Sequence, residues 1–140
     1  MRHVDVIREK ILTSEEALKK IRQWRLLGKT IAFTNGCFDI FHRGHVFSLS
    51  QAAAEADYLV VGVNSDASTR RLKGAGRPIN DQQSRALVLA SQIITDAIVL
   101  FEEDTPLRLI TLFEPEVLVK GGDYTLEQVV GAQEVLAHGG

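Results

Sequence analysis

The sequence predicts a three-layer α/β domain in which a parallel sheet carries helices on both faces. Segments typical of strands and of helices alternate along all 140 residues, and this alternation favours parallel strands joined by right-handed crossover helices. The strand segments are apolar throughout, as expected for strands covered on both faces. The length fits one domain, so we expect residues 1–140 to fold as a single unit.

Caps and apolar spacing define the elements of the first half. Thr13 and Glu16 can form a capping box, apolar residues then recur at helical spacing, and Gly28 is a natural stop. A helix is therefore expected over Thr13–Leu27. The segments that follow are a short apolar strand over 30–34, a loop over 35–43, a helix rich in small residues over 44–56 and an apolar strand over 58–63.

The second half repeats this pattern. Residues 70–80 are basic and contain glycine, which predicts an exposed loop. Asn80 or Asp81 can cap the next helix, and Pro106 suits the first position of a later one. The expected elements are helices over 81–94, 105–113 and 126–137, and strands over 97–101 and 117–120.

Composition excludes several classes of function. A net charge of −2 provides no general attraction to nucleic acid or to an anionic membrane. The single cysteine, Cys37, excludes an internal disulfide framework and a multi-cysteine zinc site, and we expect it to be a small buried residue rather than a nucleophile. The sequence contains neither an apolar run of transmembrane length nor a signal peptide. We therefore expect a cytoplasmic protein without nucleic-acid or membrane partners.

The polar residues that stand out follow the predicted strands. In open parallel α/β sheets, ligands bind beyond the carboxyl ends of the strands. The loops at those ends are 35–43, 64–80, 102–104 and 121–125, and they hold most of the unusual polar residues of the chain. The sequence thus predicts one site at this edge of the sheet.

A His-x-Gly-His motif opens the helix after the first of these strands. A helix N-terminus presents free N–H groups and partial positive charge, so it attracts phosphate. His42 and His45 are three residues apart and share one side of the first turn, while Gly44 between them lets a phosphate approach the backbone. The motif predicts a site for the phosphates of a nucleoside triphosphate. Two alternatives stay open: purely structural caps, and a metal site formed with Asp39.

The segment TNGCFDIFHRGH, residues 34–45, resembles the signature of the cytidylyltransferase-like nucleotidyltransferases, a superfamily with a Rossmann-like fold. FEEDTP at 101–106 and VKGGDY at 119–124 narrow the resemblance to the heptose 1-phosphate adenylyltransferases. It implies an enzyme that transfers AMP from ATP, with Mg²⁺, to a heptose 1-phosphate. Pyrophosphate leaves, and the product is ADP-heptose for bacterial lipopolysaccharide.

The resemblance also implies a role for particular residues. Implied catalytic residues are His42, His45 and Lys73. Implied nucleotide ligands are Thr34, Asn35, Gly36, Phe38, Gly44, Lys120, Gly121 and Asp123. Implied contacts to the sugar phosphate are Asp39, Asp66, Arg77 and Arg85. The alternatives from the residues alone are a solvated basic loop around Lys73, a helix cap at Asp66 and a surface ion pair at Arg85.

Other functions remain open at this point. One is cytidylyl or adenylyl transfer to a different phosphorylated acceptor, such as glycerol 3-phosphate or FMN. Another is a nucleotide-binding module with weak catalysis. Members of this family usually continue for a further strand and helix beyond the position of Gly140, so we expect this chain to lack them. A sheet edge exposed in this way would favour a homodimer.

Overall fold

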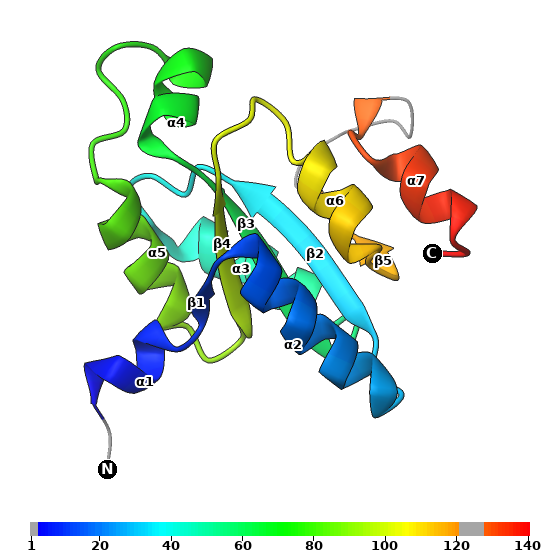
Figure 1. The fold of residues 1–140 in the computed structure, drawn as a ribbon. Coiled ribbons are helices and arrows are strands. Elements are labelled where there is room, and N and C mark those ends of the chain that lie inside the picture. Colours follow the sequence, from blue (N-terminus) through cyan, green and yellow to red (C-terminus); the bar gives the residue numbers. More distant parts are fainter. Residues whose placement is uncertain (1–2, 121–127) are drawn as a thin grey trace.

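The computed structural model describes residues 3–120 and 128–140, and within them it confirms the predicted α/β architecture. A five-stranded sheet, with every pairing parallel, has the strand order β1-β4-β3-β2-β5 (Figure 1). The strands are β1 (Ile11–Leu12), β2 (Ile31–Gly36), β3 (Tyr58–Asn64), β4 (Ala97–Phe101) and β5 (Val117–Leu118).

Helices cover both faces of the sheet. The helices are α1 (Val4–Arg8), α2 (Ser14–Leu26), α3 (Arg43–Ala53), α4 (Asp66–Lys73), α5 (Gln82–Ala90), α6 (Leu107–Phe113) and α7 (Ala132–Ala137). One core cluster joins α2, α6 and α7 to the sheet, and Phe33 and Phe101 are among its largest buried side chains. A second cluster joins α3 and α5 to the other face, around Leu49 and Leu89. Within the described ranges, no helix is long and apolar enough to cross a membrane.

Two helix caps match the sequence predictions, and two helix starts differ from them. Thr13 and Glu16 form the expected capping box at the start of α2. Asp81 caps α5 through the backbone N–H of Ser84. Pro106 lies at the N-cap of α6, one position earlier than expected. The last helix begins only at Ala132, after Gly131 in a left-handed conformation, whereas a start at 126 was expected; residues 126 and 127 lie outside the described residues.

Three elements were missed. α1 and β1 have five and two residues, which is too short for periodicity to show in a sequence. The prediction of a loop over 70–80 is wrong for its first part, because α4 extends to Lys73. The residues that α4 buries are Ser68 and Thr69, so the helix has no apolar stripe that could have revealed it.

The strand order creates a crevice at one end of the sheet. The chain runs from β2 through β3 to β4 and then returns to place β5 on the other side of β2. The direction of travel therefore reverses at β2, and ligands of parallel sheets bind at such a reversal, beyond the carboxyl ends of the strands. The segments after β2, β3 and β4 meet there, together with Lys120 after β5.

Candidate active site

A two-part cleft lies at the carboxyl ends of the strands. One cavity, of about 460 Å³, lies between β2, the end of α4 and the start of α6. A second, of about 280 Å³, lies between β2, α3 and the basic segment after α4. The two cavities share a wall formed by Asn35, Gly36, Cys37, Lys73 and Lys120.

The larger cavity combines amide groups with apolar side chains. Asn35 and Asn64 come from the ends of two neighbouring strands, and Gln128 faces them from the segment before α7. Apolar lining comes from Leu72, Pro106, Leu118, Val129 and Val130. Amides that can both donate and accept, set in apolar walls, suit a flat heterocycle with polar edges. Sequence reasoning did not assign Asn64 or these apolar residues to the site, because only the fold brings them together.

The paired imidazoles form the start of α3. The Nδ1 atom of His42 accepts from the N–H of Gly44 at 3.0 Å, and Nδ1 of His45 accepts from the N–H of His42 at 3.1 Å. A neutral imidazole that accepts at Nδ1 carries its proton on Nε2. Both rings therefore present an N–H donor, and their centroids are 4.1 Å apart. The two rings therefore combine both features: their Nδ1 atoms cap the helix, as the structural alternative expects, and their Nε2–H groups are donors, as phosphate binding requires.

His45 and His42 differ in their surroundings. His45 lines the smaller cavity and contacts the rings of Phe38 and Phe41, with centroid distances of 5.6 and 5.3 Å. Burial, followed by electrostatic interactions with His42 and Lys73, lowers the pKa of His45. His45 is thus a neutral donor at pH 7. His42 is exposed and is not part of either cavity wall.

Gly44 allows the ring of His42 to fold back over the helix start. A Cβ atom at position 44 would lie 2.7 Å from Cε1 of His42, which is closer than atoms can approach. The sequence suggested that this glycine makes room for phosphate. In the structure it makes room for the imidazole that caps the helix.

Asp39 anchors the basic segment to the β2 loop. Its carboxylate is buried and accepts from Nε of Arg77 at 2.8 Å and from the N–H groups of Ile79 and Asn80 at 2.6 and 3.0 Å. Burial alone would raise the pKa of Asp39. The backbone hydrogen bonds and the charge of Arg77 outweigh it and lower this pKa to about 2. Phe38 and Ile40, on either side, have φ of 51° and 54°, a left-handed conformation that a β-branched residue rarely adopts.

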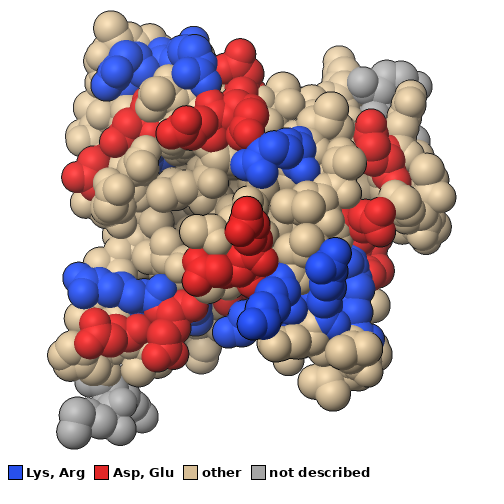
Figure 2. Space-filling view, in the orientation of Figure 1, with Lys and Arg blue, Asp and Glu red and all other residues tan. Residues whose placement is uncertain are grey.

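Basic side chains gather over α4. Figure 2 shows them beside acidic side chains at the upper left, above the strand ends. Arg71 is held by Asp104 at 2.8 Å and by the carbonyl of Glu102, so it fastens α4 to the loop after β4. Lys73 lines both cavities and has no hydrogen bond or ion pair within the described residues. The ammonium group of Lys73 is therefore available to an anion in the cleft.

The structure brings most of the predicted site residues to one cleft. Those that line the cavities are Thr34, Asn35, Gly36, Phe38, Asp39, His45, Lys73, Arg77 and Lys120. Those outside both linings are His42, Gly44, Asp66 and Arg85. Gly121 and Asp123 lie outside the described residues. Ser65 caps α4, so the alternative of Asp66 as the cap is wrong.

The structure bears on two of the alternatives: the metal site with Asp39 and the surface ion pair at Arg85. Among the residues that the structure describes, no three His, Cys, Asp or Glu side chains are grouped as metal ligands. Asp39, the third member of the alternative metal site, is occupied by Arg77 and two backbone N–H groups. Arg85 does form an ion pair, with Asp66 at 2.9 Å, but the prediction of a surface pair is wrong because the Arg85 side chain is buried.

Known proteins match both the sequence and the fold of this chain. The family described as cytidylyltransferase-like matches residues 33–138. The chain belongs to the cytidylyltransferase-like family. It is 58% identical to the Bifunctional protein HldE of Rhodopseudomonas palustris and 55% identical to that of Caulobacter vibrioides. In both cases the match covers 94% of this chain and 27% of the relative, so the chain spans about a quarter of the length of these proteins.

A solved structure supports the same assignment. A lipopolysaccharide core biosynthesis protein from Thermoplasma volcanium superposes with a TM-score of 0.67 and 25% sequence identity. The match covers 79% of this chain and 89% of that one. This cytidylyltransferase-like domain is a nucleotidyltransferase, with the Rossmann-like fold implied by the resemblance.

Proposed function

We propose that this domain transfers AMP from ATP to a heptose 1-phosphate and releases pyrophosphate. The observation that carries the proposal is the shared wall of the two cavities. Donors for phosphate line the smaller cavity, while amides and apolar groups line the larger one. A nucleotide with its base in the larger cavity would extend its phosphates past Lys73 toward His45. The FEEDTP and VKGGDY segments support the choice of acceptor.

The reaction requires mainly that the two substrates are aligned and that the negative charge on their phosphates is neutralised. A phosphate oxygen of the sugar attacks the α-phosphorus of ATP, and the bond from that phosphorus to the bridging oxygen of the β-phosphate breaks. The nucleophile is already an anion, so it needs no strong general base. Catalysis then rests on alignment and on neutralising charge that builds on the phosphoryl oxygens. Nε2–H of His45 and the ammonium group of Lys73 are suited to that task.

We assign Arg77 to the phosphate group of the acceptor sugar. Its Nε donates to Asp39, which leaves the other end of the guanidinium facing the smaller cavity that it lines. A guanidinium can bind a phosphate through two parallel N–H donors. Asp39 therefore supports the acceptor site through Arg77 in our proposal, instead of contacting the sugar.

Mg²⁺ enters this proposal as part of the ATP substrate. The smaller cavity is lined by imidazole, ammonium and guanidinium groups and by neutral side chains, and the one carboxylate among its described lining residues, that of Asp39, is already paired. This set does not suit a resident Mg²⁺ ion, which prefers oxygen ligands. Phosphate oxygens and water would hold the ion. A cytoplasmic location and a homodimer stay predictions, which cell fractionation and light scattering would test.

A coupled pyrophosphate assay tests the function directly. We expect pyrophosphate release with ATP, Mg²⁺ and heptose 1-phosphate, and little release when CTP replaces ATP. Release only with glycerol 3-phosphate or FMN would identify a related transferase with another acceptor. ATP binding without release for any acceptor would identify a nucleotide-binding module, and either result would overturn the proposal.

A further inference from the structure

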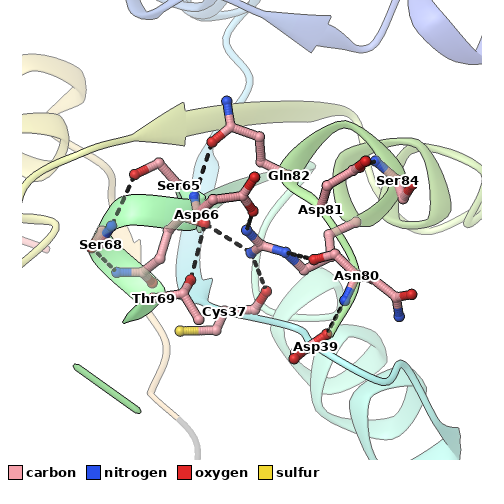
Figure 3. Close-up of polar contacts among 12 residues, drawn as sticks. Cys37, Asp39, Ser65, Asp66, Ser68, Thr69, Asn80, Asp81, Gln82 and Ser84 are labelled. Carbon is pink, nitrogen blue, oxygen red and sulfur yellow. Dashed lines mark hydrogen bonds and ion pairs between the residues drawn. The ribbon is translucent and has the colours of Figure 1, made fainter. Parts of the chain in front are cut away.

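A buried guanidinium lies directly behind the cleft. Arg85 lies on α5, and its side chain is 1% exposed. It donates four hydrogen bonds: to the carbonyls of Asn80 at 2.9 Å, Cys37 at 2.7 Å and Asn64 at 2.8 Å, and to the carboxylate of Asp66 at 2.9 Å. Figure 3 shows three of the acceptor residues, Cys37, Asp66 and Asn80, gathered in one place. We call these five residues the Arg85 clasp.

The four acceptors come from separate segments that surround the site. Cys37 directly follows β2, Asn64 ends β3, Asp66 begins α4 and Asn80 ends the basic segment. Cys37 and Asn64 also form part of the wall of the larger cavity. One side chain thus fixes the relative positions of two strand ends, a helix start and a loop. With 1% of its side chain exposed, Arg85 has almost no surface left for a substrate.

The clasp continues to the phosphate donors through Asn80. The carbonyl of Asn80 accepts from Arg85, and its N–H donates to Asp39. Asp39 in turn holds Arg77, which lines the smaller cavity. A continuous set of hydrogen bonds therefore leads from the buried Arg85 to a cation at the cleft.

We propose that Arg85 is a positioning residue, which sets the spacing of the β2 and β3 ends and, through Asn80 and Asp39, the position of Arg77. The effect of Arg85 on turnover rests on the function proposed above, whereas its effect on the geometry of the cleft does not. Lysine cannot replace it, because an ammonium group donates from one point while the planar guanidinium reaches acceptors in several directions.

Amide hydrogen exchange of the full ligand-free chain tests the proposal. We expect R85K to speed exchange in segments 37–39, 64–66 and 77–80 about tenfold or more, which corresponds to losing one or two buried hydrogen bonds. Exchange in α2 should stay unchanged. R25K is the matched control: Arg25 binds the Glu116 carboxylate and the Glu114 carbonyl, at the opposite end of the sheet. It should leave the three segments unchanged.

Two results would overturn the proposal. Unchanged exchange in the three segments, with a raised KM for the sugar phosphate, would make Arg85 a direct substrate ligand. Faster exchange across the whole chain, α2 included, would make it a residue of general stability. If R85K does not fold, D66N keeps the shape of the carboxylate partner and should speed exchange in segment 64–66.

Exchange in segment 77–80 also provides a second test of the connection. If Arg85 acts through Asp39, this segment should exchange no faster in the R85K/D39N double variant than in the faster-exchanging single variant. Additive increases in the logarithm of the exchange rate would contradict the connection. Absence of AMP transfer in the unmodified protein would refute the proposed function, yet exchange would still decide the role of Arg85.

Discussion

The two ends of the parallel sheet use charge in opposite ways. At the amino-terminal end, carboxylates accept from backbone N–H groups near the strand starts. Asp57 accepts from Thr30 at 2.9 Å, Asp96 from Leu59 at 2.8 Å and Glu116 from Ile31 at 2.7 Å. Parallel strands expose N–H groups at one end and carbonyls at the other, so acceptors belong at the first end and donors at the second.

The carboxyl-terminal end follows the same rule but holds donors beyond those that the strand carbonyls use. Arg85 satisfies the carbonyls of Cys37 and Asn64, as the carboxylates satisfy the N–H groups at the other end. Lys73 and His45 are placed around the cleft in addition to it. The backbone thus sets whether acceptors or donors gather at each end, and function uses the donors beyond those that the backbone needs.

The largest expected effect comes from removing one of these additional donors. H45A should lower turnover about a hundredfold, because one donor to a developing oxyanion contributes roughly 3 kcal/mol. Steady-state kinetics of the pyrophosphate assay measures this effect. H138A, at an exposed histidine near Glu114, is the control and should keep full activity. Normal turnover in folded H45A would refute the role of the imidazole.

Asp39 gives the next largest effect, on stability. Its folded-state pKa is about 2, below the ordinary value of 3.8, so its contribution is complete above pH 3.8 and is lost as the pH falls through 2. The difference corresponds to about 2 kcal/mol at pH 7. D39N should lose about that much in urea unfolding, and its stability should fall less steeply below pH 4. If the free energy of unfolding fell equally with pH in D39N and in the original protein, this account would be contradicted.

Residues with local signals were predictable from the sequence, and those with only tertiary partners were not. Caps at Thr13 and Asp81 depend on neighbours three residues away, and both were predicted. The apolar strands β2, β3, β4 and β5 were likewise predictable from their own residues, whereas the two-residue β1 was too short. The helix α4 was missed because its buried side chains are Ser68, which donates to the carbonyl of Glu103, and Thr69, which donates to the carbonyl of Asn64.

The candidate site divides in the same way. The motif around His45 indicated the phosphate cavity, because a helix start and an adjacent imidazole are local features. Arg85 carried no such signal: as a single arginine on a helix it favours a surface ion pair. Its burial follows from four acceptors supplied by segments up to 48 residues away. Asn64 entered the cavity for the same reason, since only strand pairing places it beside β2.

A third prediction concerns the amino-terminal end of the sheet. Glu116 accepts from the N–H of Ile31 and from Arg25 at 3.0 Å, with about a third of its side chain exposed. E116Q weakens the acceptor and removes the charge, so it should lower the free energy of unfolding by about 1 kcal/mol. Turnover should stay within about twofold of the original, because the residue faces away from the cleft. A loss of turnover with unchanged KM would show that the two ends are coupled.

The smallest effect is expected at Asp96, and it separates the role of an acceptor from that of a charge. Burial raises the pKa of Asp96, although the Leu59 hydrogen bond and the charges of Lys10 and Lys20 oppose the shift. A raised carboxyl pKa means that the folded protein loses stability as the pH rises from 3.8 through the folded-state value. D96N keeps an oxygen for Leu59 and removes the buried charge, so stability at pH 7 should change by less than about 0.5 kcal/mol. Urea unfolding across pH 3–7 would measure it, with the variant lacking that decline. A large loss at pH 7 would show that the amino-terminal end requires negative charge, and not merely acceptors for its N–H groups.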